Sequence, residues 1–308
     1  MTRRAAGSGP APDPAAPLSG AVRGPKSMST TQPGPSTPDG ADRDPGGPLR
    51  LGVFGGSFDP VHEGHVELVR RAQEAFGLER VHWVPARRPP HKLDRVLASD
   101  TFRYAMTLIA TIGEPSWEVL TLELTREGPS YTYDTLLEIE DRARPLVTPK
   151  KDGGKARRRR ELELYLIIGS DNLPGLPGWK NAEDVLRIAR PIVVWRGGQT
   201  PAEHVAALAG RLPEEAVERI CEGFIELPPL PYSSTEVREA LAQGQVPEGA
   251  LHHEVLEFLV EKGLYDWPDS VPCPPDPRPP VVSRFQPPPD PEARPDPGIR
   301  RRARRDGP

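Results

Sequence analysis

The sequence contains few cysteines, few aromatic residues and no long hydrophobic run. Its two cysteines, Cys221 and Cys273, cannot form a disulfide framework, which favours a reducing compartment. No segment approaches the roughly 18–20 apolar residues that are needed to span a bilayer. Arg3 and Arg4 are not followed by the apolar segment of a secretory signal. We therefore expect a cytoplasmic protein that does not act on a membrane.

An excess of charge of one sign is also missing. The 40 Lys and Arg residues nearly balance the 44 Asp and Glu residues, and the net charge is −4. This balance gives no general attraction to nucleic acid or to anionic membranes, so we expect no nucleic-acid partner. Basic residues do cluster at 157–160 and at 300–305. We interpret both clusters as solvated charge, with contact to an anionic partner as the alternative.

Proline and glycine, in contrast, are abundant, and the prolines are unevenly distributed. Of 41 prolines, ten lie in residues 1–48 and fourteen in residues 268–308. The 219 residues between them hold every Trp and Tyr and enough aliphatic residues for one sizeable core. A fibrous, collagenous or fully disordered chain is thereby excluded. We predict disordered tails at 1–48 and 268–308 around a single globular domain at 49–267.

Within this domain, short apolar segments alternate with segments of helical periodicity. Strands are predicted at 51–54, 81–84, 117–124, 164–168, 192–195 and 224–227. Helices are predicted at 65–76, 101–112, 133–143, 182–188 and 202–212, with two more near the C-terminus. This order predicts an α/β fold, a Rossmann-like doubly wound parallel sheet with helices on both faces. A basic surface loop, inserted at about 147–161, interrupts the pattern.

The most informative segment follows the first predicted strand and reads GGSFDPVHEGH, from Gly55 to His65. Ligands of doubly wound sheets bind at the carboxyl ends of the strands. Gly55 and Gly56 let backbone N–H groups approach a phosphate closely. His62 and His65 stand at the start of the next helix, where unpaired backbone N–H groups already favour an anion. The segment therefore predicts a phosphate-binding site.

A second segment near the end of the domain has the same chemical character. It reads SSTEVR, from Ser233 to Arg238. Ser234 and Thr235 would open a helix and offer N–H and hydroxyl donors, and Arg238 lies one turn further on. These residues are suited to binding a polyphosphate.

These two segments resemble the GGxFxPxHxGH signature and the late S-[ST]-T-x-[IV]-R element of the HxGH nucleotidyltransferase superfamily. Tyr232 departs from the pattern, since the family usually has Ile there, and we expect this to alter packing more than chemistry. Three further segments resemble those of bacterial nicotinate-mononucleotide adenylyltransferases. They are RPPHK at 88–92, GPSYT at 128–132, and LIIGSD at 166–171 with the Trp179 that follows it. The closing GLY at 263–265 is also typical, and the resemblance extends from about residue 50 to 267.

The resemblance implies a role for each matching residue. ATP would be bound by Gly55, Gly56, Ser57, Phe58, His62, His65, Gly169, Asp171, Ser233, Ser234, Thr235 and Arg238. The catalytic residues would be His62, His65, Lys92 and Arg238, with His65 contacting the α-phosphate in the transition state. Nicotinate mononucleotide would be bound by Lys92, Ser130, Tyr131, Thr132, Tyr133 and Trp179. Trp179 would stack on the pyridine ring, and the backbone N–H of Tyr133 would meet the nicotinate carboxylate.

The implied reaction is adenylyl transfer from ATP to nicotinate mononucleotide, giving deamido-NAD and pyrophosphate in NAD biosynthesis. Mg²⁺ would arrive with ATP, so no dedicated protein metal site is expected. Two alternatives stay open: the same fold acting on nicotinamide mononucleotide or another acceptor, and a non-catalytic nucleotide-binding or scaffold protein. A homo-oligomer is compatible with the sequence.

Overall fold

The computed structural model describes residues 47–87, 97–147, 151–152, 155–156, 160–195, 197, 199–228 and 232–276. Residues 1–46 and 277–308, which hold most of the two predicted tails, lie outside the described residues. The same is true of Lys92 and of most of the predicted insertion.

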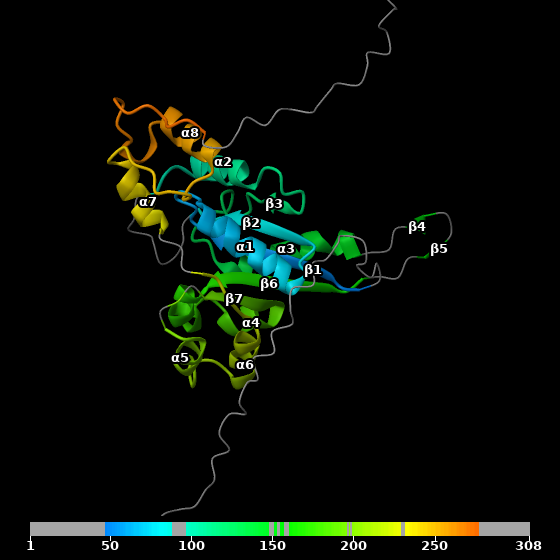
Figure 1. The fold of residues 1–308 in the computed structure, drawn as a ribbon. Coiled ribbons are helices and arrows are strands. Elements are labelled where there is room, and N and C mark those ends of the chain that lie inside the picture. Colours follow the sequence, from blue (N-terminus) through cyan, green and yellow to red (C-terminus); the bar gives the residue numbers. More distant parts are fainter. Residues whose placement is uncertain are drawn as a thin grey trace, which may run out of the picture. The chain divides into compact units, whose positions relative to one another are not determined.

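A six-stranded sheet forms the centre of the fold (Figure 1), and all of its neighbouring strands are parallel. Its strands are β1 (Leu49–Gly56), β2 (Arg80–Pro85), β3 (Trp117–Val119), β6 (Leu162–Gly169), β7 (Ala189–Trp195) and β8 (Phe224–Glu226). Their order is β3-β2-β1-β6-β7-β8. The chain therefore winds outward first to one side of β1 and then to the other. The point at which the winding reverses lies between β1 and β6, where such sheets bind ligands.

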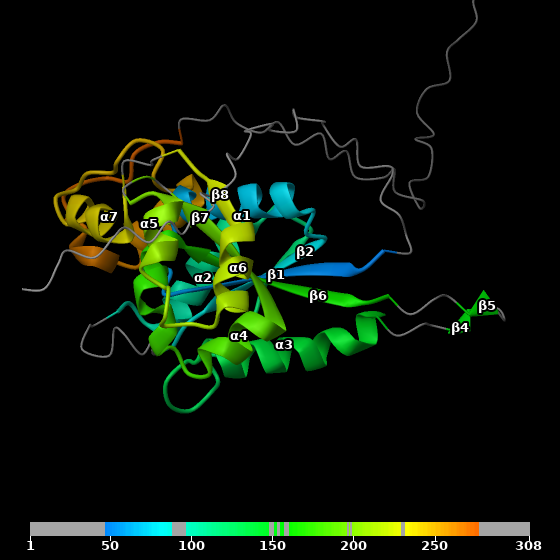
Figure 2. The same cartoon turned by 90° about the horizontal axis from the view of Figure 1, so that it is seen from below.

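Helices cover both faces of the sheet, as predicted. They are α1 (Glu63–Phe76), α2 (Asp100–Thr111), α3 (Thr132–Val147), α4 (Ala182–Ile188), α5 (Pro201–Ala206), α6 (Glu214–Glu222), α7 (Ser234–Leu241) and α8 (His253–Glu261), with 3₁₀ helices η2 (Ser170–Gly178) and η3 (Leu264–Asp266). Figure 2 shows α3 and α4 on one side of the sheet and α1 on the other.

Alternating side chains of the buried strands divide the apolar interior into two cores. On β6, Leu164, Leu166 and Ile168 join the core that includes residues of α3, α4 and α6. Tyr165 and Ile167 of the same strand join the core that includes residues of α1, α2, α7 and α8. Because β6 is buried on both faces, its sequence is almost continuously apolar.

Two predicted elements are longer in the sequence pattern than in the structure. The strand predicted at 117–124 ends at Val119, after which the chain turns, with Thr125 N–H donating to the Thr121 carbonyl at 3.1 Å. Glu123 continues the alternation in sequence, but its carboxylate accepts a 2.7 Å hydrogen bond from Thr135 of α3 instead of extending the strand. The helix predicted at 202–212 ends at Ala206.

Two helices, α6 and η2, have no counterpart among the predicted elements. In α6 only Ala216 and Ile220 are buried, so the helix shows a single four-residue apolar spacing among charged residues. In η2, Pro174 and Pro177 obscure the helical signal. The α2 start, in contrast, is as predicted: Ser99 caps it by accepting a 3.3 Å hydrogen bond from the Phe102 N–H.

The basic insertion joins the sheet at the amino end of β6. Its short strands β4 (Lys151–Asp152) and β5 (Lys155–Ala156) pair antiparallel, where a loop without strands was expected. Arg160 anchors the base of the insertion by donating to the Gly47 and Pro48 carbonyls at 2.7 and 2.8 Å. Arg160, at the base of the insertion, is therefore held at the end of the sheet opposite to the carboxyl ends of the strands.

The packed chain also continues past residue 267, where the C-terminal tail was predicted to begin. The Trp267 indole N–H donates to the Val271 carbonyl at 2.8 Å, and Val271 and Cys273 pack against the core that includes residues of α1, α2, α7 and α8. These contacts hold the chain after Trp267 against the domain.

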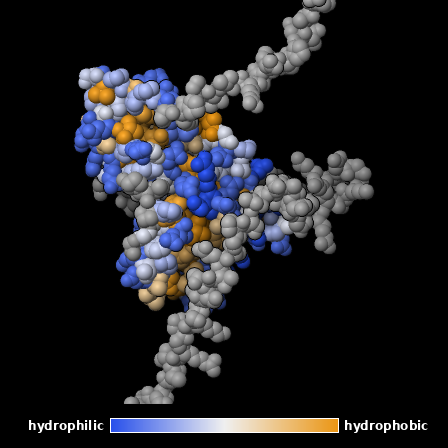
Figure 3. All heavy atoms as spheres, in the orientation of Figure 1, coloured by the Kyte–Doolittle hydropathy of each residue, from blue (hydrophilic) through white to orange (hydrophobic). Residues whose placement is uncertain are grey.

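The surface shows hydrophobic residues in separate groups among hydrophilic ones on the face drawn in Figure 3. Large exposed apolar side chains among the described residues are Leu108, Ile112 and Leu137. No helix in the described part of the chain is long and apolar enough to cross a membrane.

Candidate active site

The loop between β1 and α1 lies at the carboxyl edge of the sheet, beside the ends of β2 and β6. Phe58 takes a left-handed backbone conformation with φ 49°, and its ring is buried. A Cβ at Gly56 would lie only 2.6 Å from the Phe58 ring. Glycine is therefore required at position 56 for the aromatic ring to fold back under the loop. Gly55 has no such neighbour and lies exposed at the strand end.

His62 and His65 face each other at the start of α1, as their spacing predicted. Their ring centroids are 3.8 Å apart. His62 is the N-cap residue and is buried, and its backbone N–H donates to His65 Nδ1 at 3.2 Å. The Phe58 ring meets the His65 ring edge-on at 5.3 Å. Since Nδ1 accepts a hydrogen bond, a neutral His65 carries its proton on Nε2.

The late SSTEVR segment forms the start of α7. Ser233 is the N-cap residue: its hydroxyl accepts from the Glu236 N–H at 3.3 Å, and the Glu236 carboxylate accepts from the Ser233 N–H at 2.6 Å. This reciprocal cap fixes the first turn. It leaves Ser234 and Thr235 at the helix N-terminus, where backbone N–H groups have no partner within the helix.

The two predicted phosphate-binding segments are in direct contact, although about 170 residues separate them. The Ser234 hydroxyl donates to the Pro60 carbonyl at 3.1 Å. The Arg238 guanidinium donates to the Asp59 carbonyl and to the Thr235 hydroxyl, the latter at 3.1 Å. The starts of α1 and α7 thus form one site, with His62, His65 and Arg238 contributed by both sides.

Tyr232 packs under this junction. Its hydroxyl donates to the Gly249 carbonyl at 2.8 Å, and its ring meets the His62 ring edge-on at 5.8 Å. Burial, with a smaller contribution from the Glu63 carboxylate, raises the pKa of the Tyr232 phenol. The residue that departs from the family pattern therefore supports a histidine of the site.

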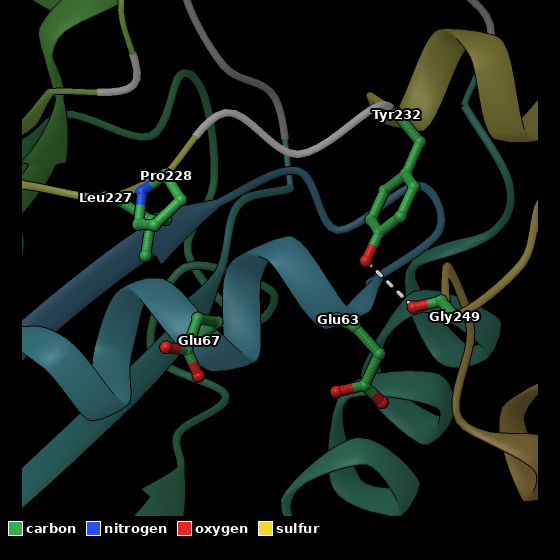
Figure 4. A pocket seen from close by; sticks show the side chains of 6 residues that line it. All are labelled: Glu63, Glu67, Leu227, Pro228, Tyr232 and Gly249. Carbon is green, nitrogen blue, oxygen red and sulfur yellow. Dashed lines mark hydrogen bonds between the residues drawn. The ribbon is translucent and has the colours of Figure 1, made fainter.

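A hollow of about 390 Å³ lies beside the start of α1. Figure 4 shows Glu63 and Glu67 projecting from α1 on one side of it, with Tyr232 and its hydrogen bond to Gly249 on another. Its lining residues are Glu63, Glu67, Leu227, Pro228, Tyr232 and Gly249. The two carboxylates make this side of the helix unfavourable for an anion.

Arg103 supports the same loop by a hydrogen bond to the Ser57 carbonyl, and no sequence pattern predicts this role. The side chain is completely buried in α2. Its guanidinium donates to the carbonyls of Ser57 (2.7 Å), Ala86 (2.6 Å) and Ala98 (3.0 Å), and it pairs with Asp100. It therefore ties the end of β1, the end of β2 and the start of α2 together. An arginine in an amphipathic helix is usually exposed, and only the structure shows that this one is not.

The GPSYT segment leads into α3, and its Ser130 contacts a second buried polar group that sequence reasoning missed. Glu123 is buried, and it accepts hydrogen bonds from Thr135 at 2.7 Å and from Ser130. Ser130 in turn accepts from the Arg87 N–H at 3.3 Å. Burial raises the pKa of the Glu123 carboxyl, and these hydrogen bonds offset part of that rise.

The two halves of the predicted pyridine pocket are joined by Lys180. Its ammonium pairs with both oxygens of Asp134, at 2.9 and 3.0 Å, and lies 4.9 Å from the centre of the Tyr131 ring. Trp179 precedes it and is half-buried against the core that includes residues of α3, α4 and α6. Thr132 and Tyr133 are the first two residues of α3, so their N–H groups belong to the unpaired set at the helix start.

The remaining predicted residues lie at the end of β6. Gly169 closes the strand and is buried, and its carbonyl accepts from the Asn172 amide at 3.3 Å. Asp171 is exposed in the first turn of η2. Lys92 lies outside the described residues. Among the residues that the structure describes, no three His, Cys, Asp or Glu side chains are grouped as a metal site would require.

Comparison with known proteins agrees with this geometry. The family model described as cytidylyltransferase-like matches residues 53–240. A probable nicotinate-nucleotide adenylyltransferase of Dehalococcoides mccartyi is 33% identical over 217 residues, which cover 70% of this chain and 97% of the relative. One from Gloeobacter violaceus is 35% identical over 222 residues, which cover 71% and 97%.

Among solved structures, the nicotinic acid mononucleotide adenylyltransferase of Plasmodium falciparum complexed with NaAD is similar with a TM-score of 0.50. It is 18% identical, and the match covers 71% of this chain and 98% of that one. At this identity the likeness shows the fold, and the sequence relatives show the family. The chain belongs to the cytidylyltransferase-like family and, within it, to the nicotinate-nucleotide adenylyltransferases.

Proposed function

We propose that this chain transfers the adenylyl group of ATP to nicotinate mononucleotide, giving deamido-NAD and pyrophosphate in NAD biosynthesis. Its curated relatives carry the name of that activity. The observation that carries the proposal is the contact between the starts of α1 and α7, where Ser234 bonds to Pro60 and Arg238 bonds to Asp59. This contact brings the start of α1, which carries the two histidines, beside the start of α7, which carries Arg238, and so supports an ATP site between them.

The arrangement suits phosphoryl chemistry that needs no covalent nucleophile. A phosphate oxygen of the mononucleotide attacks the α-phosphorus of ATP in line, and pyrophosphate leaves. Such a reaction depends on positioning and on stabilising the charge that develops on the phosphate oxygens. His65 would donate its Nε2–H to an α-phosphate oxygen, since its Nδ1 accepts the His62 N–H. His62, at the N-cap, would assist from the helix start.

The pyrophosphate portion would lie toward α7. Ser234 and Thr235 open this helix, and Arg238 projects from its second turn. The carboxylates of Glu63 and Glu67 line the opposite side of α1 and would repel a phosphate there. We therefore place the triphosphate between His65 and Arg238, with Ser233 holding the turn. The loop residues that would line the triphosphate site are Gly55, Gly56, Ser57 and Phe58. The residues that would border the adenosine are Gly169 and Asp171.

The nicotinate mononucleotide would bind against the start of α3. The Tyr133 N–H, in the first turn, would meet the nicotinate carboxylate, and Trp179 would stack on the pyridine ring. Tyr131 and Thr132 would complete the wall. The Ser130 hydroxyl is bonded to Glu123 and to the Arg87 N–H, so we assign it to shaping the pocket. Lys92 would assist with the phosphates.

Mg²⁺ would enter as the ATP complex. The buried carboxylate of the signature loop is that of Asp59, and it accepts hydrogen bonds from Ala98 and Tyr265. The ion would therefore take most of its ligands from phosphate and water oxygens, as Mg²⁺ commonly does with nucleotides.

The proposal is tested by incubating the full-length protein with Mg-ATP and nicotinate mononucleotide and identifying deamido-NAD by mass spectrometry. We expect product with the wild type, and about 100-fold slower formation with Arg238→Gln, because a donor to the transferring phosphates is lost. Arg219→Gln is the matched control, since Arg219 bonds only the Leu186 carbonyl on the far face of the sheet. No deamido-NAD from the wild type, or equal rates for the two variants, would contradict the proposal.

A further inference from the structure

The closing GLY segment, which the proposed reaction does not use, reaches directly into the active-site loop. Tyr265 lies on η3, just after α8, and η3 packs against α7 and α8. Its hydroxyl donates to Asp59 Oδ1 at 2.9 Å. Asp59 belongs to the signature loop, so this hydrogen bond joins two residues 206 positions apart.

Unusual backbone conformations occur at Tyr265 and directly before Asp59. Tyr265 has φ 58° and Asp266 has φ 55°, in the left-handed region that residues with a Cβ disfavour. Phe58, which precedes Asp59, has φ 49°. Conformations of this kind persist where the surrounding structure requires them, and they concentrate at functional sites.

Asp59 connects this hydrogen bond to the phosphate-binding arginine. Its side chain is 4% exposed. Oδ1 accepts from two donors, Tyr265 and the Ala98 N–H at 3.1 Å, which fixes the rotation of the carboxylate. Oδ2 then lies 3.8 Å from the Arg238 guanidinium. At this distance Arg238 is attracted without being drawn into a close two-bonded pair, and its hydrogen bonds go to the Asp59 carbonyl and to Thr235.

We infer that Tyr265 is a positioning residue for the pyrophosphate portion of ATP. By holding Asp59 Oδ1, its hydroxyl keeps the carboxylate from turning fully onto Arg238 and leaves the guanidinium directed at the phosphates. Without the hydroxyl, the carboxylate rotates into a closer pair with Arg238 and competes with the phosphate for it. The inference rests on the proposed function only in assigning Arg238 to the departing pyrophosphate.

Calorimetric titration of the full-length protein with Mg-pyrophosphate tests this role without requiring turnover. Tyr265→Phe removes only the hydroxyl, and we expect pyrophosphate to bind about tenfold more weakly, as for loss of one hydrogen bond to a charged group. Tyr104→Phe on α2 is the matched control and should bind like the wild type. In an Arg238→Lys background, Tyr265→Phe should cause no further loss of pyrophosphate affinity, because the Tyr265 hydroxyl affects binding only through the Arg238 guanidinium.

A purely structural role gives a different result. Unchanged pyrophosphate binding in Tyr265→Phe, or an equal further loss in the Arg238→Lys background, would overturn the inference. In the turnover assay, the KM for nicotinate mononucleotide should stay within about twofold, and a parallel rise in both substrates' KM values would also overturn it. Failure of the wild type to form deamido-NAD would refute the proposed function alone, since the pyrophosphate titration needs no acceptor.

Discussion

Replacing Arg103 by Met should destabilise the protein more than any other single arginine change that we discuss. Arg103 is completely buried, and it supplies hydrogen-bond donors to three backbone carbonyls, of Ser57, Ala86 and Ala98. Methionine fills similar volume but donates nothing. All three carbonyls would lose a charged donor, and the carboxylate of Asp100 would lose its closest partner.

The size of the effect follows from what is left unpaired. A buried carbonyl without its partner costs about 1–3 kcal/mol. Water can reach some of these groups after the substitution, and losing one member of a buried charged network typically costs about 3–5 kcal/mol in all. For a domain of this size each kcal/mol lowers Tm by about 2–4 °C, so Tm should fall by about 6–20 °C.

Urea unfolding and thermal melting of the full-length protein at one pH measure this loss. Arg71→Met is the matched control, because Arg71 makes only an exposed ion pair with Glu67 at 2.8 Å and should contribute about 0.3–0.5 kcal/mol. Lysine at position 103 would restore a charge but not the fork of donors, so Arg103→Lys should fall between the two. An Arg103→Met variant within about 1 kcal/mol of Arg71→Met would refute the reasoning.

Three further predictions concern the site, its pocket and the insertion. His65→Ala should lower turnover by about 100-fold without unfolding the protein, because a donor to the α-phosphate is lost, and near wild-type turnover would remove His65 from the mechanism. Burial raises the pKa of the Glu123 carboxyl above its ordinary value of 4.5. The wild type therefore loses unfolding free energy as the pH rises from 4.5 through that raised pKa, because the buried carboxyl then ionises. Glu123→Gln should therefore gain unfolding free energy relative to the wild type as the pH rises from 4.5 through that raised pKa, and a constant difference in urea titrations would count against this. Replacing residues 148–159 by a short glycine linker should leave kcat unchanged, because the eight-residue β6 separates the insertion from the site by about 26 Å; a clear fall in kcat would contradict that.

The order of strands and helices could be predicted from the sequence because each buried strand is short and apolar and each main helix has one apolar face. The two candidate phosphate-binding segments could also be recognised in the sequence, since glycines, histidines and a serine-threonine cap carry their chemistry in their own residue types. Their contact through Ser234 and Pro60 follows from the topology, which brings both to the carboxyl edge of the sheet.

The residues that sequence reasoning missed all act through distant partners. Arg103, Asp59 and Glu123 are polar side chains whose burial is set by tertiary packing. Nothing in the local pattern around Glu123 indicates that Thr135 will turn toward it and end the strand early. The same holds for Tyr265, whose partner lies at the other end of the domain.

The most direct test of the account is pyrophosphate release from Mg-ATP with nicotinate mononucleotide and with nicotinamide mononucleotide, measured side by side. We predict a strong preference for the acid, because the first turn of α3 presents N–H groups suited to its carboxylate. Equal use of both acceptors would keep the adenylyl transfer but contradict the role of the Tyr133 N–H. Release with neither acceptor would contradict the central claim.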